Sequence, residues 1–244
     1  NDKPRSFYSS EETVYPDSNK LDFFARVRLS PAGISEYSMG HGGFMLSAII
    51  TFEDGTKTLI TTDESWRARK NGAYNAPDSF DGRIAPDEYV NAAFTPDIWH
   101  ALPAPIPVRY EEELRPENSG ILLLPHEEKR LVLELDKIWG GFIQAEASVE
   151  GRMDATVMCR ETNEETSPER LIFEGKQTYR GFKLHSAGNL LVTVKNLSDR
   201  EAKLKITFIK THFPVYEEAS TVTSDASLNA VLETCKHTLK ICRQ

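Results

Sequence analysis

The sequence predicts a mainly β protein, with two antiparallel β-sandwiches of jelly-roll type followed by one amphipathic α-helix. Three observations lead to this prediction. Short apolar segments separated by turn residues recur at even spacing between residues 121 and 211. The dipeptide Asp54-Gly55 joins two β-like segments, as in a tight hairpin. Residues 224–244 show the 3.6-residue period of a helix.

The first predicted sandwich covers residues 1–110. Residues 1–20 are polar and contain prolines, so we expect a loop or arm there. Apolar alternation predicts a strand at 21–29, and the hairpin is expected to pair 44–52 with 57–62. Residues 70–86 are rich in Gly, Asn, Pro and Asp, which indicates an excursion from the sheet. The cluster Pro103-Ala-Pro-Ile-Pro107 cannot join a central sheet, so we place a domain boundary near residue 110.

The second predicted sandwich covers residues 111–216 and contains eight short strands. The turn signals between them include Gly140-Gly141, Glu150-Gly151, Ala187-Gly188-Asn189 and Asn196–Asp199. The predicted strands are residues 121–124, 130–135, 142–149, 153–160, 170–173, 177–185, 189–194 and 202–211.

Residues 217–244 are predicted to form a linker and one helix. Ser224 and Asp225 both offer an N-cap oxygen to the first free backbone N–H groups. The apolar positions share one face at helical spacing, which requires a partner: Leu228, Val231, Leu232, Cys235, Leu239 and Cys242. Everything before the helix is predicted to be β-structure. We therefore expect the helix to begin a further helical domain, of which this chain would be the front portion.

Composition narrows the function classes. The formal net charge is −8 and the pI is about 5.4, so nucleic acid and anionic membrane surfaces are not expected partners, whereas a neutral sugar is compatible. No apolar run has the length of a membrane span. The three cysteines, Cys159, Cys235 and Cys242, have no disulfide spacing, which fits a reducing compartment without fixing one. Cytoplasm and periplasm both remain open.

Aromatic residues supply the candidate sugar-binding site, because pyranose faces stack on flat rings. Trp139 is the first candidate, since Gly140 and Gly141 beside it would let a ligand approach the backbone. The alternative is that Trp139 ends a strand and packs at the rim of the sandwich. Trp66 and Trp99 are further candidates. His41, in Gly40-His41-Gly42-Gly43, is either a ligand contact or a solvated loop residue.

The residues show no catalytic constellation and no metal or cofactor site. The six histidines are dispersed, and no zinc-ligand spacing, P-loop, dinucleotide fingerprint or Gly-x-Ser-x-Gly motif is present. Residues 77–88 superficially resemble a calcium loop, but Pro77 stands where the first ligand should be. Adjacent acids such as Glu164-Glu165 do not predict a glycosidase dyad, which needs two carboxyl groups held across a cleft.

The order of the motifs resembles that of bacterial α-L-rhamnosidases, glycoside hydrolase family 78. Asp54-Gly55 is followed by Thr62-Asp63-Glu64-Ser65-Trp66, similar to the family's hairpin and T-D-x-x-W strand end. Glu88-Tyr89-Val90-Asn91-Ala92 resembles G-E-x-Y-D-A-R, although Asp87 stands where the family often has Gly and Asn91 where it often has Asp. The remaining similar segments are Leu133–Phe142, Arg160-Glu161, Thr178–Lys183 and Thr223–Asn229.

This resemblance implies that the parent protein hydrolyses terminal α-L-rhamnosides with inversion, using a general acid and a general base. In the family those carboxylates lie in an (α/α)6 barrel, whose first helix would begin near Leu228. No acid of this chain is assigned either role. Three hypotheses follow: a non-catalytic front portion of such an enzyme, with the barrel as its partner in the same chain; an autonomous module that binds a rhamnosylated glycan; or a structural or interaction domain.

Overall fold

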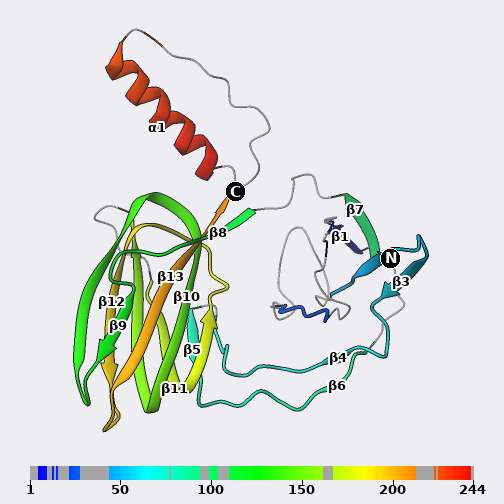
Figure 1. Ribbon diagram of the computed structural model, residues 1–244, viewed down its shortest axis with the longest axis horizontal. Coiled ribbons are helices and arrows are strands. Elements are labelled where there is room, and N and C mark those ends of the chain that lie inside the picture. Colours follow the sequence, from blue (N-terminus) through cyan, green and yellow to red (C-terminus); the bar gives the residue numbers. More distant parts are fainter. Residues whose placement is uncertain are drawn as a thin grey trace. The chain divides into compact units, whose positions relative to one another are not determined.

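The computed structural model confirms a mainly β chain with one C-terminal helix (Figure 1). It describes residues 5–9, 13, 15, 22–27, 44–76, 78–93, 99–103, 110–161, 167–212, 223 and 225–242. The chain divides into two compact units. One comprises residues 1–70 and 87–107, and the other comprises residues 71–86 and 108–244. The domain limits expected from the sequence stay a prediction.

The described part of the first unit forms three two-stranded sheets. In one of them β1 (Arg5–Ser9) pairs in parallel with β7 (Trp99–Pro103), so a strand lies where the sequence predicts a loop. The other two sheets pair β2 (Ser47–Thr51) with β3 (Lys57–Thr61) and β4 (Arg67–Ala68) with β6 (Val90–Asn91). Residues 22–27 form no strand, although they lie in the strand expected at 21–29. A complete first sandwich is therefore not shown by the described residues.

The β2–β3 hairpin follows the sequence prediction closely. The Gly55 N–H donates to the Phe52 carbonyl over 2.9 Å, and Gly55 adopts φ +82°, which glycine tolerates without a Cβ clash. The Asp54 carboxylate accepts from the Thr56 N–H at 2.9 Å and so closes the turn. The Asp-Gly dipeptide therefore places the two strands in register, with Ile49 opposite Leu59.

A seven-stranded sheet and the helix make up the second unit. The sheet contains β5 (Ser79–Asp81), β8 (Tyr110–Leu114), β9 (Gly120–Leu123), β10 (Glu128–Arg160), β11 (Glu169–Arg180), β12 (His185–Asn196) and β13 (Ala202–His212). Within it β5 pairs in parallel with β11, whereas β8 and β9 both pair antiparallel with β13. The residues of β5 belong to the excursion predicted at 70–86, which here becomes an edge strand.

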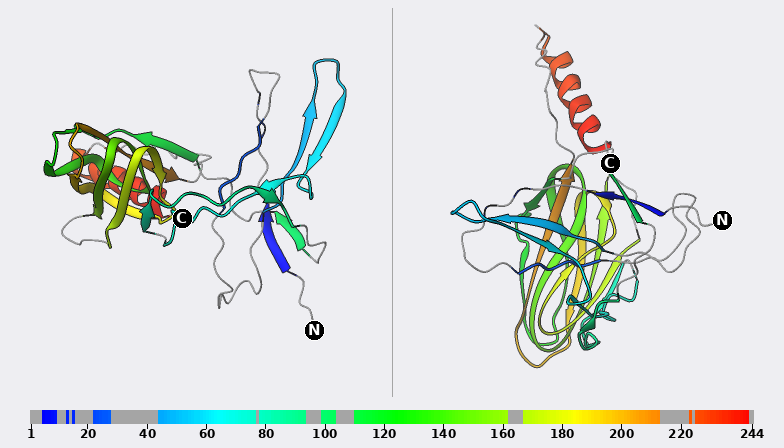
Figure 2. Two further views of the ribbon diagram at one scale, coloured as in Figure 1. Left: turned by 90° about the horizontal axis from the view of Figure 1, so that it is seen from below. Right: turned by 90° about the vertical axis from the view of Figure 1, so that its right-hand side faces the viewer.

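One long strand, β10, organises this sheet. Its first part, residues 128–134, and its last part, residues 153–160, flank β12 on either side. Its middle part, residues 141–148, pairs with β13. β11 follows β10 from residue 144 to residue 157 across a bulge between Val149 and Arg152. The sheet therefore curves around its own interior, as both views of Figure 2 show.

Alternating side chains of these strands fill that interior. Along β10 the residues at odd positions from 143 to 149 and from 153 to 159 are buried, and their even-numbered neighbours are more exposed. The largest fully buried members of the core are Tyr179, Phe173, Phe208, Leu123, Leu133, Ile143 and Met153.

The helix α1 (Ala226–Cys242) begins at the predicted cap. The Asp225 carboxylate accepts from the backbone N–H of Ser227 at 2.8 Å and from its hydroxyl at 2.7 Å. Both hydrogen bonds lower the pKa of the Asp225 carboxyl, and the one from the Ser227 hydroxyl has the larger effect. Within the described residues, no helix combines the length and the apolar character that a bilayer span requires.

Candidate functional site

Trp139 lies inside β10, and does not end a strand as the sequence suggests. Its ring is only 7% exposed, and its Nε1–H donates to an Asp136 carboxylate oxygen at 2.8 Å. Two side chains cover the ring. The Lys210 ammonium lies 4.4 Å from the ring centroid, and the His237 ring of α1 meets it edge-on at 4.7 Å. A pyranose could stack on Trp139 only after one of these side chains moved away.

Gly141 serves the packing of the sheet. A Cβ built on Gly141 would lie 2.2 Å from the Ile209 carbonyl oxygen of β13 and 2.7 Å from the Phe208 ring. Ile209 pairs with Phe142, the next residue of β10. The space that the absent side chain leaves is therefore filled by a neighbouring strand, which explains the glycine without a ligand.

Trp66 follows the β2–β3 hairpin and is half-buried. Its Nε1–H donates to the Thr61 carbonyl at 3.0 Å, while its ring lies 6.3 Å from the Phe23 ring and 6.4 Å from the Phe44 ring. Phe23 is 37% exposed and Phe44 is 46% exposed, so these three rings form an aromatic cluster that is open to solvent. Of the two candidate tryptophans whose side chains are described, Trp66 has the surroundings that better suit stacking on a sugar.

The other two candidates cannot be placed as side chains. Trp99 belongs to β7, whose backbone alone is described, and His41 lies outside the described residues. Trp66 and Trp139 belong to different units of the chain. The proposed sugar-binding role of all four residues therefore stays a prediction.

The β4–β6 pair carries a polar cluster that the sequence reasoning missed. Arg67 lies opposite Asn91 in the ladder, while Arg69 directly follows β4 and Tyr89 directly precedes β6. The guanidinium carbon of Arg69 is 4.4 Å from the Tyr89 ring centroid, and that of Arg67 is 5.5 Å from it. Arg67 also donates to the Tyr89 carbonyl at 3.1 Å. The available signal was Arg-x-Arg in an extended segment, which places both arginines on one face.

A buried acid–base pair connects β11 with β12. Glu169 is fully buried and accepts from Tyr179 Oη at 2.9 Å and from His185 Nε2 at 2.7 Å. The side chains of Glu169 and His185 are at most 1% exposed. Such a pair could transfer a proton chemically, but a substrate cannot reach it. Its role is to fix the ends of two strands. The sequence places Glu169 just before a predicted strand and His185 at the end of another, without indicating that they meet.

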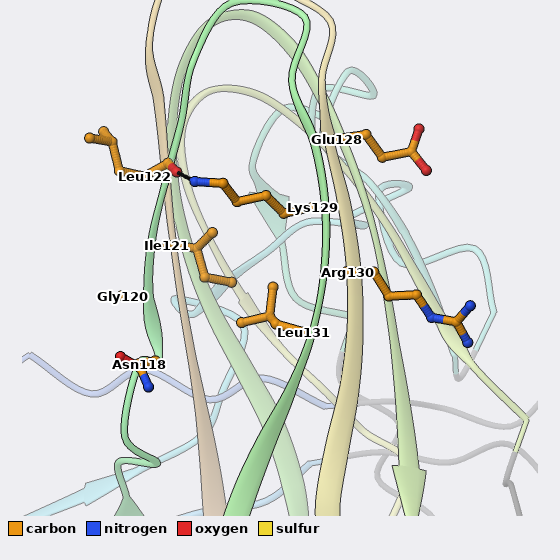
Figure 3. A pocket seen from close by; sticks show the side chains of 8 residues that line it. All are labelled: Asn118, Gly120, Ile121, Leu122, Glu128, Lys129, Arg130 and Leu131. Carbon is orange, nitrogen blue, oxygen red and sulfur yellow. Dashed lines mark hydrogen bonds between the residues drawn. The ribbon is translucent and has the colours of Figure 1, made fainter.

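The described residues also line an open groove between β9 and the beginning of β10, with a volume of about 490 Å³ (Figure 3). Ile121 and Leu131 point toward each other at its floor, and the Lys129 ammonium donates to the Leu122 carbonyl across it at 2.6 Å. No aromatic side chain lines the groove. It therefore lacks the flat ring on which a sugar would stack.

Two of the four acids in the calcium-like loop, Asp81 and Asp78, lie beside basic side chains. Arg83 donates to the Asp81 carboxylate at 2.8 and 2.7 Å, and this hydrogen bonding is the main cause that lowers the pKa of Asp81. Asp78 lies 3.7 Å from the Lys183 ammonium. Among the described residues no group of three or more histidine, cysteine or acidic side chains is arranged to hold a metal ion.

No protein-family model matches the sequence, and no curated protein matches it. Among solved structures, a GH78 family rhamnosidase of Bacillus sp. GL1 shares 23% identity over 66% of this chain and 17% of its own, with a TM-score of 0.42. A de novo designed double-stranded β-helix shares 15% identity over 40% of this chain and 97% of its own, with a TM-score of 0.22. PirA shares 9% identity over 41% of this chain and 92% of its own, with a TM-score of 0.23. Because the chain spans only 17% of the rhamnosidase, the activity of that whole enzyme is not carried over to it.

Proposed function

We propose that this chain is the non-catalytic front portion of an α-L-rhamnosidase-like glycoside hydrolase, with its second unit interpreted as a jelly-roll-like sandwich. The catalytic acid and base would belong to helices that pack against α1. The order of the sequence motifs, from the Asp54-Gly55 hairpin to the cap at Asp225, supports this proposal. In that role the β units would hold the helical domain and shape the rim of its cleft.

The two faces of α1 carry the proposal. His237 donates to the Ile138 carbonyl at 2.7 Å, and Ile241 packs against the core of the β unit. His237 lies nine residues after Leu228, which places it about 180° around the helix from the apolar stripe. The helix therefore contacts the sheet with the side opposite to its apolar stripe.

Most of that stripe is open to solvent, although Leu232 is half-buried. Leu228 is 52% exposed, Val231 is 57% exposed and Leu239 is 71% exposed. Contiguous apolar surface of this kind favours burial against another element. A second layer of helices, as in a helical barrel, would bury the stripe without disturbing the contacts of His237.

Hydrolysis of an aryl α-L-rhamnoside tests the proposal. We expect the 244-residue chain to give no turnover and a longer chain that includes the helical domain to release the aryl alcohol. A matched longer chain in which Leu239 is replaced by Glu should lose soluble, folded enzyme, because a charge would enter the buried helical interface. Turnover by the 244-residue chain alone would contradict the placement of the catalytic groups.

A second candidate is an autonomous module that binds a rhamnosylated glycan. The solvent-open cluster of Trp66, Phe23 and Phe44 favours it. Calorimetric titration with rhamnose decides the question. Heat that disappears in Trp66→Ala but persists in Trp139→Phe would support this module. Absence of heat at millimolar sugar would leave the β units with a structural role.

A further inference from the structure

Two arginines of the first unit share one aromatic ring on one face of the β4–β6 pair. Arg67 begins β4 and Arg69 directly follows it, and both guanidinium groups lie against the Tyr89 ring. On the other side of the ladder, Asn91 lies directly opposite Arg67, and Tyr89 comes two residues before Asn91. The four side chains therefore form one polar surface within a single unit of the chain.

Both guanidinium groups have spare donors. A guanidinium carries five N–H donors. Of these, one donor of Arg67 is used by the Tyr89 carbonyl. Among the described residues, neither arginine forms an ion pair, although Asp87 and Glu88 directly precede Tyr89. Asn91 is neutral, so the residue that faces Arg67 across the ladder supplies no negative charge.

The tyrosine holds these two positive charges close together. The distances from the ring centroid, 4.4 and 5.5 Å, place the guanidinium carbons at most about 10 Å apart. This separation is about one Debye length at moderate salt, so their repulsion is not fully screened. An anion between them would relieve the repulsion and use the spare donors.

The chemistry of that anion follows from the geometry and the net charge. Guanidinium forks match the two oxygens of a carboxylate. The chain carries a net charge of −8, which opposes a polyanion such as nucleic acid far more than a ligand with one isolated charge. The Asn91 amide offers both a donor and an acceptor, which suit the hydroxyls of a sugar.

We propose that Arg67, Arg69, Tyr89 and Asn91 form a binding site for the carboxylate of an acidic sugar, such as a uronic acid residue of a glycan. The choice of a carbohydrate rests on the proposed function, whereas the anion site rests on the geometry alone. The tyrosine holds the two guanidinium groups, both arginines bind the carboxylate, and Asn91 contacts the sugar hydroxyls.

Titration of the isotope-labelled 244-residue chain with sodium glucuronate at low salt tests this site. The arginine Nε–H signals of Arg67 and Arg69 should shift in a saturable way, whereas glucose at the same concentrations should leave them in place. Arg69→Gln should weaken binding about tenfold or more, because charge-assisted hydrogen bonds are lost. Asn91→Asp should also weaken it, because the new carboxylate would pair with Arg67. Arg170→Gln, at an exposed arginine of β11, is the matched control and should bind as the parent does.

Glucuronate that leaves both arginine signals unmoved would overturn the site, as would equal binding by the Asn91→Asp variant. Equal binding of sulfate and glucuronate would overturn the assignment to an acidic sugar. Backbone spectra of Arg69→Gln that match the parent show that the fold is retained. Rhamnoside hydrolysis by the longer chain is a separate measurement, so this site and the proposed function can fail independently.

Discussion

Replacing His237 by Ala tests how α1 is attached to the β unit. The Ile138 carbonyl can only accept, so His237 Nε2 must carry the proton of the 2.7 Å hydrogen bond. The same ring also meets Trp139 edge-on at 4.7 Å. The substitution removes both contacts, and alanine keeps a high helix propensity, so the helix itself should not be weakened.

The size of the effect follows from these two contacts. A neutral hydrogen bond contributes about 0.5–1.5 kcal/mol, and an edge-to-face aromatic pair contributes about 0.5–1.5 kcal/mol. Their loss should destabilise the docked helix by about 1–3 kcal/mol, which corresponds to roughly a 5- to 150-fold change in the docking equilibrium. Leu239→Gln, on the stripe that is open to solvent, should change the free energy of helix docking by less than about 0.5 kcal/mol.

Amide hydrogen exchange over residues 226–242 measures the docking, and the indole Nε1–H signal of Trp139 reports whether its ring becomes exposed. We expect faster exchange and a shifted indole signal in His237→Ala, and neither change in Leu239→Gln. The opposite ranking of these two variants would refute our assignment of the helix faces. It would mean that the apolar stripe, and not the histidine side, faces the sheet.

Three further predictions concern other parts of the chain. Tyr179→Phe should destabilise the second unit by about 1.5–3 kcal/mol in urea unfolding, because Glu169 loses its bond from the phenol, and the effect should shrink in a Glu169→Gln background. Burial raises the pKa of the Cys159 thiol, so in a Cys242→Ser variant Cys235 should react quickly with a thiol reagent and Cys159 only after unfolding. The hydrogen bonds from Ser227 lower the pKa of Asp225 on folding, so they stabilise the helix start above the unfolded pKa and are lost as the pH falls through the folded one. Asp225→Ala should therefore fray residues 226–230 at neutral pH but differ little from the parent in acid, as carbon chemical shifts would show.

Elements with a strong local signal could be predicted from the sequence. The β2–β3 hairpin depends on Gly55, whose positive φ is a local requirement. The helix α1 depends on a cap at Asp225 and on a repeated apolar spacing. Both signals span only a few turns or residues, so no distant contact is needed to interpret them.

The course of β10 could not be predicted, because it depends on distant partners. The sequence suggests three strands between residues 130 and 160, separated by turns at Gly140-Gly141 and Glu150-Gly151. In the structure β10 continues through both Gly140-Gly141 and Glu150-Gly151. Gly141 admits the backbone of β13, and Gly151 lies in the bulge where β10 bends along β11. A glycine can mark a turn, a bulge or a close approach, and local sequence does not separate these roles.

The candidate site also depends on contacts between distant parts of the chain, which local sequence does not reveal. Trp66 could be identified as an aromatic beside a hairpin, but its neighbour Phe23 comes from a segment far away in the chain. The arginine cluster needs the register of two short strands, Arg67 with Asn91 and Ala68 with Val90. Likewise, Glu169 lies opposite Val157 and His185 lies opposite Gly141 in the strand registers, so their meeting depends on how the sheet folds over its interior.

The helix α1 shows what a hydrophobic pattern does and does not specify. The spacing of Leu228, Val231 and Leu239 indicates that one face requires a partner, and the sequence identifies none within the preceding β unit. The structure places that unit on the opposite face, where His237 and Ile241 make the contact. A single amphipathic helix can therefore join two layers, a polar contact holding it to the sheet and an apolar stripe available to a second layer. For this reason the exposed stripe, more than the amphipathic pattern by itself, supports the proposed second layer of helices against α1.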